Sequence, residues 1–181
     1  LGSVFIFLFP WKKLAEKWNK GPAYGLGLGI GAVSVALTFF LPAHNTILIF
    51  IVAFIAGLGF ATNWIFPWAM VPDVIEYDQL KTGESRGGMY YGVWGFTSKL
   101  TNALAVAIAG WVLEIFRYVP NGVQSDFTLL GIRLFFGPVP AVIILVALPL
   151  LFWYPITREK HSQVRREIEL QQQALTTKGD D

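Results

Sequence analysis

The stretch AYGLGLGIGAVSVALTFFL, residues 23–41, carries no charged side chain along its whole length. A helix needs about 20 predominantly apolar residues to cross a hydrocarbon core of roughly 30 Å. The glycines at alternate positions between Gly25 and Gly31 would let a neighbouring helix approach closely, as small residues do in lipid. This stretch is therefore predicted to be a membrane-spanning helix in close contact with another helix.

Other apolar stretches of spanning length follow it, and a shorter one opens the chain. The predicted complete spans are residues 23–41, 46–71, 88–116 and 127–155. Residues 1–10 are too short to cross and are predicted to be the end of a truncated transmembrane helix. The polar segments are predicted to be loops at residues 11–22 and 72–87 and a tail at residues 156–181. The sequence thus predicts an all-α, polytopic membrane protein with one partial and four complete transmembrane helices.

The composition of the 181-residue chain supports the same class. Hydrophobic residues make up 54% and charged residues only 14%, a balance that argues against a single soluble core. The net charge is +2, and the basic residues form short clusters, which argues against a nucleic-acid partner. Because the chain has no cysteine, a disulfide framework and thiolate metal sites are excluded.

Lysine and arginine are distributed unevenly between the predicted loops. Three segments on one side of the membrane are basic, with Lys12, Lys13, Lys17 and Lys20, then Lys81 and Arg86, then Arg158, Lys160, Arg165 and Arg166. The connections on the other side contain only Arg117. The positive-inside rule therefore predicts that the basic loops and the C-terminus are cytoplasmic. The lipid bilayer, as the cell (inner) membrane, is the predicted location of the multi-pass chain.

One lysine lies inside a predicted span. Lys99 is eleven residues past Gly88, near the middle of its helix. A lysine at that depth costs roughly 2.5 to 3.5 kcal/mol on insertion scales, so it is predicted to face a cavity or a partner. The alternative is that its ammonium group snorkels to an interface, which is difficult from mid-helix.

Aromatic side chains gather in the cytoplasmic half of the second span. Trp64 and Trp68 flank Pro67 there, with Asn63 beside them. Aromatic faces can stack on the C–H edges of pyranose rings, but tryptophans in membrane helices also serve as lipid-facing belts or packing residues. The residues alone leave both interpretations of Trp64 open.

Charge is concentrated in the loop after that span. Asp73 and Glu76 follow the helix, and Arg86 precedes the next one. Acids and a base at one membrane edge could form an ion-pair network that holds one conformation and releases in another. A solvated turn is the plainer interpretation, and it suits Asp78, Lys81 and Glu84.

The segment PWAMVPDVIEYDQLKTGESRGGMYYGVWGFTSKLTNALAVAIAG, residues 67–110, resembles the region between the tenth and eleventh helices of the glycoside–pentoside–hexuronide:cation symporters. This melibiose permease-like family is a branch of the major facilitator superfamily. The pattern Pro-Asp-x-x-Glu-Tyr, then Thr-Gly, an Arg before Gly, Tyr-Gly and a Lys inside the next helix carries the resemblance. YVPN with QS downstream and the YPIT-basic tail extend it from Lys12 to about Glu169.

The resemblance implies that the chain is the C-terminal part of a twelve-helix carrier that works by alternating access. It implies that Trp64 contacts sugar and that Lys99 lies close to both sugar and cation sites, with Trp94 and Thr97 as secondary pocket residues. A cytoplasmic gate is implied at Asp73, Glu76 and Arg86. The family often has two basic residues where this chain has Ser85-Arg86, and an acid at Gly87, so this gate is expected to be weaker or made differently.

The predicted function is cation-coupled symport of a glycoside or related sugar, such as a pentoside or hexuronide. The expected partners are the sugar, the coupling cation (Na⁺ or H⁺) and the missing N-terminal half, which should carry the main cation-binding carboxylates. No other cofactor and no metal site are expected.

Alternatives are a lysolipid or other amphiphile transporter with a lateral apolar opening, and a non-transporting membrane scaffold, which the cost of burying Lys99 disfavours. An enzyme is not predicted, because His44 and His161 lie in a turn and in the tail without a nucleophile beside them.

Overall fold

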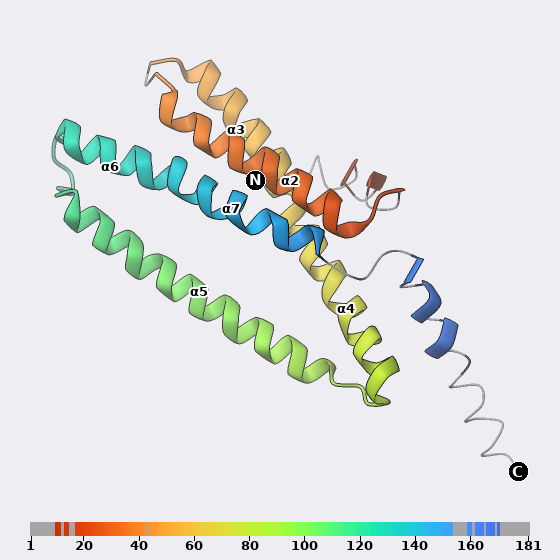
Figure 1. Ribbon diagram of the computed structural model, residues 1–181. Coiled ribbons are helices and arrows are strands. Elements are labelled where there is room, and N and C mark those ends of the chain that lie inside the picture. The colour runs from red at the N-terminus through yellow and green to blue at the C-terminus, as the bar shows by residue number, and fades with distance from the viewer. Residues whose placement is uncertain are drawn as a thin grey trace, which may run out of the picture.

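The computed structural model describes residues 10–11, 13–14, 17–42, 44–153, 159–160, 162–164, 166–168 and 170. Its helices follow one another as α2 (Lys20–Leu37), the short 3₁₀ turn η1 (Thr38–Phe40), α3 (Thr46–Phe60), α4 (Thr62–Thr82), α5 (Gly87–Ile115), α6 (Asp126–Phe136) and α7 (Pro138–Phe152). Long helices make up the body of the molecule (Figure 1).

Four helical segments are long and apolar enough to cross a membrane. They are Lys20–Phe40, Thr46–Thr82, Gly87–Ile115 and Asp126–Leu151. Each corresponds to one of the complete spans predicted from the apolar stretches, because run length and lack of charge are the properties that spanning requires. The predicted all-α, polytopic class is confirmed.

The second span is longer than its apolar run. It is interrupted at Ala61, between α3 and α4, and α4 then continues through Pro67 and Pro72 to Thr82. The helix ends at Gly83, whose φ of 73° is left-handed and whose N–H donates to Gln79 O, as in a glycine-ended helix. Most of the predicted loop at 72–87 is therefore helical, because a proline bends a helix without always ending it. The polar connection itself is residues 83–86.

The last span is also divided in two. α6 ends at Phe136 and α7 begins at Pro138, with Gly137 between them. Proline suits the first position of a helix, since its missing N–H has no partner there in any case. The start of α6 is capped by Ser125, whose side-chain oxygen accepts a hydrogen bond from the backbone N–H of Thr128 at 3.2 Å.

Small residues hold α2 against the broken α3–α4 span. A Cβ added at Gly59 would meet the carbonyl oxygen of Gly27 at 2.6 Å and Gly31 Cα at 2.7 Å. Near the break, the buried indole of Trp11 donates to Leu58 O at 2.8 Å. The two spans therefore pack backbone to backbone, which only glycine allows at Gly59.

α2 lies between α3 and α7, whereas α5 runs along one side of the molecule (Figure 1). Helix α5 contacts α4 near one end and α6 near the other. None of its residues is buried within the part of the chain that the structure describes. The long helix that carries Lys99 is thus the least covered part of the described structure.

Candidate transport site

A pocket of about 400 Å³ lies between α4 and α5. Its lining includes Val71 and Val74 from α4 and Tyr90, Trp94, Thr97 and Ser98 from α5. The α5 residues recur at three- and four-residue intervals, so one face of that helix supplies them. The pocket combines apolar surface with an indole and three hydroxyl groups. It contains two of the predicted sugar-pocket residues, Trp94 and Thr97.

Two tryptophans meet at the edge of this pocket. The rings of Trp68 and Trp94 lie 5.5 Å apart between centroids, with an angle of 31° between their planes. Trp64 is one helical turn before Trp68 and is 64% exposed, so it extends the same α4 face. The described pocket lining does not include Trp64 itself. Trp68 therefore makes the aromatic contact between α4 and α5, and Trp64 is an exposed ring one turn earlier on α4.

Asn63, beside Trp64, is engaged elsewhere. Its Oδ1 accepts a hydrogen bond from the hydroxyl of Tyr24 on α2 at 2.7 Å. The Tyr24 ring also stacks on Phe66, with 5.6 Å between centroids. This amide fastens α4 to α2, so it has less capacity to bind a solute.

Lys99 lies on a different side of α5 from the pocket. It follows Ser98, a lining residue, but is itself exposed and makes no hydrogen bond or ion pair with the residues that the structure describes. Residues three, four and seven positions away share a helix face, so Lys99 shares its face with Gly92 and Gly95. A Cβ on either glycine would meet nothing within 4 Å. The ammonium group thus projects from a smooth, uncovered strip of α5, and the structure does not bring it together with Thr97.

The predicted gate residues separate into two pairs. Asp73 is 4% exposed, and its Oδ2 accepts from Lys20 Nζ at 2.6 Å. The same ammonium group donates to Ala69 O at 3.0 Å. Lys20 is the first residue of α2, so this ion pair ties the start of α2 to the middle of α4.

Arg86 does not reach Asp73. Its guanidinium binds Glu84 Oε2 through two nitrogens, at 2.9 and 3.1 Å, and both side chains are exposed. Glu76, half-buried on α4, also has an interaction partner. The structure therefore brings Asp73 together with Lys20, and Arg86 with Glu84.

Lys20 and Trp68 take part in these contacts, but the sequence analysis did not predict either of them as a site residue. A signal for Lys20 was present, since it ends the basic loop just before one span while Asp73 lies at the same membrane side of the next. Antiparallel helices bring such positions together. Trp68 could have been found from its four-residue spacing to Trp64.

The sequence of this chain is similar to those of known transport proteins. The sequence model of the family described as MFS/sugar transport protein matches residues 1–158. An uncharacterized symporter of Synechocystis is 32% identical over 95% of this chain and 33% of its own length. A putative sulfoquinovose importer of Salmonella typhimurium is 32% identical over 93% of this chain and 36% of its own length. A sodium-dependent lysophosphatidylcholine symporter of Gallus gallus is 28% identical over 88% of this chain and 30% of its own length.

Four helices of membrane-spanning length and the match to a transport family together indicate a multi-pass membrane protein of the transporter class. The chain belongs to the MFS/sugar transport protein family, and the resemblance to the melibiose permease-like symporters is confirmed. The chain spans about a third of the length of the relatives reported above.

Proposed function

We propose that this chain is the C-terminal part of a carrier that moves a glycoside or related sugar together with a cation by alternating access. The observation that carries the proposal is the α4–α5 pocket, where an indole, three hydroxyl groups and a second tryptophan meet between helices of membrane length. The lining surface is mainly apolar, which suits the C–H faces of a sugar, and three of its residues carry hydroxyl groups. The names of the symporter and importer relatives support the same class of solute.

In this mechanism, Trp64 and Trp68 present their ring faces to the sugar. Trp94 and Thr97 contact the sugar from the α5 side. Lys99 acts from the neighbouring face of α5, where its charge can bind a solute oxygen or a carboxylate from the rest of the carrier. A lysine left without such a partner at mid-membrane depth is unfavourable, so its position requires one. The coupling cation, Na⁺ or H⁺, is assigned to the N-terminal half.

The Lys20–Asp73 ion pair is proposed as the structural element of the cytoplasmic gate. Separating a buried carboxylate from its cation leaves an unpaired charge, which is strongly unfavourable. α2 and the middle of α4 are therefore expected to move together, while Glu76 and Arg86 adjust at the outer end of α4. The basic loops and the C-terminus are assigned to the cytoplasm, with the chain in the cell membrane.

A lysolipid or other amphiphile is the second candidate solute, because one relative is a lysophosphatidylcholine symporter. The pocket lining is mainly apolar and includes three hydroxyl-bearing residues, so it is compatible with either class of solute. A non-transporting scaffold would leave Lys99 without a function. The choice among these depends on what the full-length protein moves.

The test is radiolabelled uptake by the full-length protein in proteoliposomes. The panel comprises α- and β-glycosides, pentosides, hexuronides and lysophosphatidylcholine, each with and without a sodium gradient and with and without a proton gradient. Accumulation of a sugar that depends on a cation gradient is the expected result. Uptake of lysophosphatidylcholine that sugars do not inhibit would overturn the sugar assignment, and no uptake of any class would overturn the carrier assignment.

A further inference from the structure

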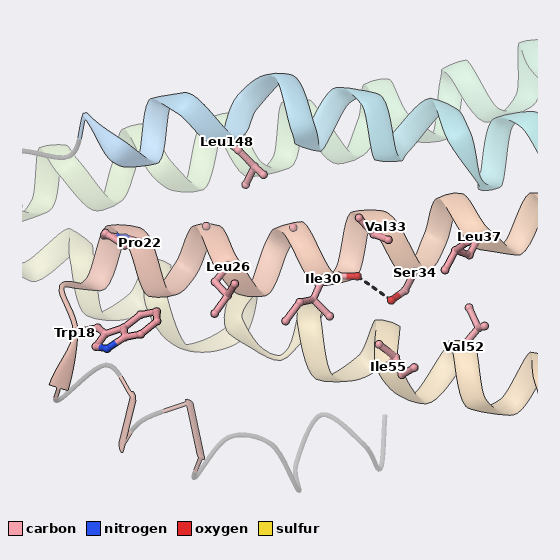
Figure 2. A pocket seen from close by; sticks show the side chains of 12 residues that line it. Trp18, Pro22, Leu26, Ile30, Val33, Ser34, Leu37, Val52, Ile55 and Leu148 are labelled. Carbon is pink, nitrogen blue, oxygen red and sulfur yellow. Dashed lines mark hydrogen bonds between the residues drawn. The ribbon is translucent and has the colours of Figure 1, made fainter.

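A long apolar groove runs along the exposed face of α2. It has a volume of about 680 Å³ and is lined mainly by α2, with Leu26, Ile30, Val33 and Leu37 along its length. Ile55 of α3 and Leu148 of α7 form its two sides (Figure 2). No described lining residue is shared with the α4–α5 pocket, so this groove is a separate feature of the fold.

Two glycines create the hollow. Gly25 and Gly29 lie on the groove side of α2 and have no side chains to fill it. A Cβ added at Gly29 would meet only Leu148 Cδ1, at 3.7 Å, which is an ordinary contact. Close helix packing therefore does not require glycine at this position, in contrast to Gly59. The space above Gly29 is open to an occupant.

Apart from Trp18, the described lining of the groove has no hydrogen-bonding side chain that needs a polar partner. Ser34 contributes a hydroxyl to its lining, and that hydroxyl already donates to Ile30 O at 2.7 Å (Figure 2). The other side chains that point into it are aliphatic apart from the ring of Trp18. A hydrocarbon chain satisfies such a surface without leaving a hydrogen-bonding group unpaired.

The chain segment that leads into one end of the groove is basic. Trp18, 50% exposed, stands at that end (Figure 2), and Lys17 is its neighbour in the chain. Lys13 and Lys17 line a second hollow of about 580 Å³. Neither has an ion pair or hydrogen bond within the described part of the chain, whereas Lys20 is paired with Asp73. An indole at the end of an apolar groove, with two cations in the segment that precedes it, matches a hydrocarbon chain attached to an anionic headgroup.

The groove is longer than the hydrocarbon layer of one leaflet. Pro22 and Leu37, at its ends on α2, are separated by about 22 Å at 1.5 Å per helical residue. A leaflet's hydrocarbon layer is about 15 Å, half of the full core. An acyl chain that starts at Trp18 would therefore lie within the groove over its whole length.

From these observations we infer a binding site for one anionic phospholipid of the leaflet that faces the basic loops. Its acyl chain lies along α2 between Ile55 and Leu148, and its phosphate is bound by Lys13 and Lys17 beside Trp18. The lipid occupies the site as a bound component and is not transported. This assignment is independent of which solute the α4–α5 pocket receives.

The test measures phosphatidylglycerol bound to the purified full-length protein, against phosphatidylcholine as the neutral lipid. Native mass spectrometry after titration with each lipid gives the apparent affinity for the first molecule bound. Replacing Lys13 and Lys17 together by Gln is expected to weaken phosphatidylglycerol binding about 30-fold, because each basic side chain at an anionic surface contributes about five-fold. Phosphatidylcholine binding is expected to be unchanged.

Matched variants separate the site from general lipid contact. Gly29→Phe fills the groove and should reduce binding of both lipids to this site, while V146F adds the same ring at an exposed position of α7 and should not. Replacing Lys13 and Lys17 by Arg should preserve binding, and R117Q, at the other end of the spans, should have no effect. Size-exclusion chromatography identifies any variant that fails to fold.

A brominated phosphatidylglycerol localises the bound lipid. It should quench less fluorescence in W18F than in the parent protein. Equal affinity for the two lipids, equal binding by Gly29→Phe and the parent protein, or quenching that W18F leaves unchanged would each overturn the inference. So would a structure of the full-length protein in which another of its helices fills the groove.

Discussion

Helices α2 and α5 are both rich in glycine, yet their glycines serve different surfaces. On α2, Gly27 and Gly31 are buried against the α3–α4 span. On α5, a Cβ added at Gly88, Gly92, Gly95 or Gly110 would meet nothing within 4 Å. The same residue type therefore marks a closed contact in one helix and an open face in the other.

The difference also concerns charge. The buried residues of α2 carry no charge, and its one lysine, Lys20, is paired with Asp73 at the start of the helix. α5 carries Lys99 in the middle of its open face. A smooth face with a single cation suits a surface that a solute or another helix approaches. We interpret α2 as a helix that stabilises the packing of the spans and α5 as a helix whose open face receives a solute or another helix.

The largest effect is expected from the open face. K99L should reduce solute uptake by the full-length protein at least about 100-fold, the size of effect expected when a group that positions the solute is lost. Lys99→Arg keeps the charge and should retain part of the uptake. Initial rates in proteoliposomes, at equal amounts of inserted protein, provide the measurement. Uptake by K99L equal to that of the parent would remove Lys99 from the mechanism.

The second effect concerns the closed contact. G59A should lower the stability of the full-length protein by about 1–3 kcal/mol, because the added methyl group meets backbone atoms of Gly27 and Gly31 that cannot move aside. Thermal unfolding monitored by intrinsic fluorescence measures the change. A stability equal to that of the parent would contradict the backbone-to-backbone packing of α2 and α3.

G110A, on α5, is the matched control. In the described chain the new methyl group meets no atom, and alanine is a better helix former than glycine, so stability should be unchanged or rise by roughly 0.5–1 kcal/mol. A loss comparable to that of G59A would sharpen the comparison, because it would show that another helix of the carrier covers the α5 face at Gly110.

The helical spans could be predicted from the sequence because spanning a membrane depends on length and lack of charge, which are local properties. The break at Ala61 and the continuation of α4 to Thr82 could not. The break lies where glycines of α2 and the indole of Trp11 contact the span, so it depends on residues far away in the chain. The continuation of α4 through Pro72 placed Asp73 inside a helix instead of in a loop.

The candidate site was predictable in part for the same reason. Trp94 and Thr97 are three residues apart on one helix, so a shared face follows from helical spacing alone. The pairing of Asp73 required knowing how α2 sits against α4. The sequence analysis proposed Arg86 as the base of the gate, but its side chain is held by Glu84, only two residues away. The roles of these residues in binding and gating stay predictions.

A smaller effect is expected at the paired end of α2. D73N leaves Lys20 with a neutral partner and should change maximal uptake about ten-fold more than it changes the substrate KM, since a gate acts on turnover. Exchanging the two residues, K20D with D73K, should recover part of the rate. A defect confined to KM would contradict the gate assignment.

The smallest effect is expected at the exposed pair beyond α4. E84Q removes the partner of Arg86, but both side chains are in solvent, where ion pairs contribute about 0–1 kcal/mol. Uptake rate and unfolding temperature should therefore remain close to those of the parent, in contrast to D73N. If E84Q instead slows turnover as much as D73N does, then the exposed Glu84–Arg86 ion pair matters to gating as much as the Lys20–Asp73 pair, and the division between the buried pair at α2 and the solvated pair before α5 would have to be abandoned.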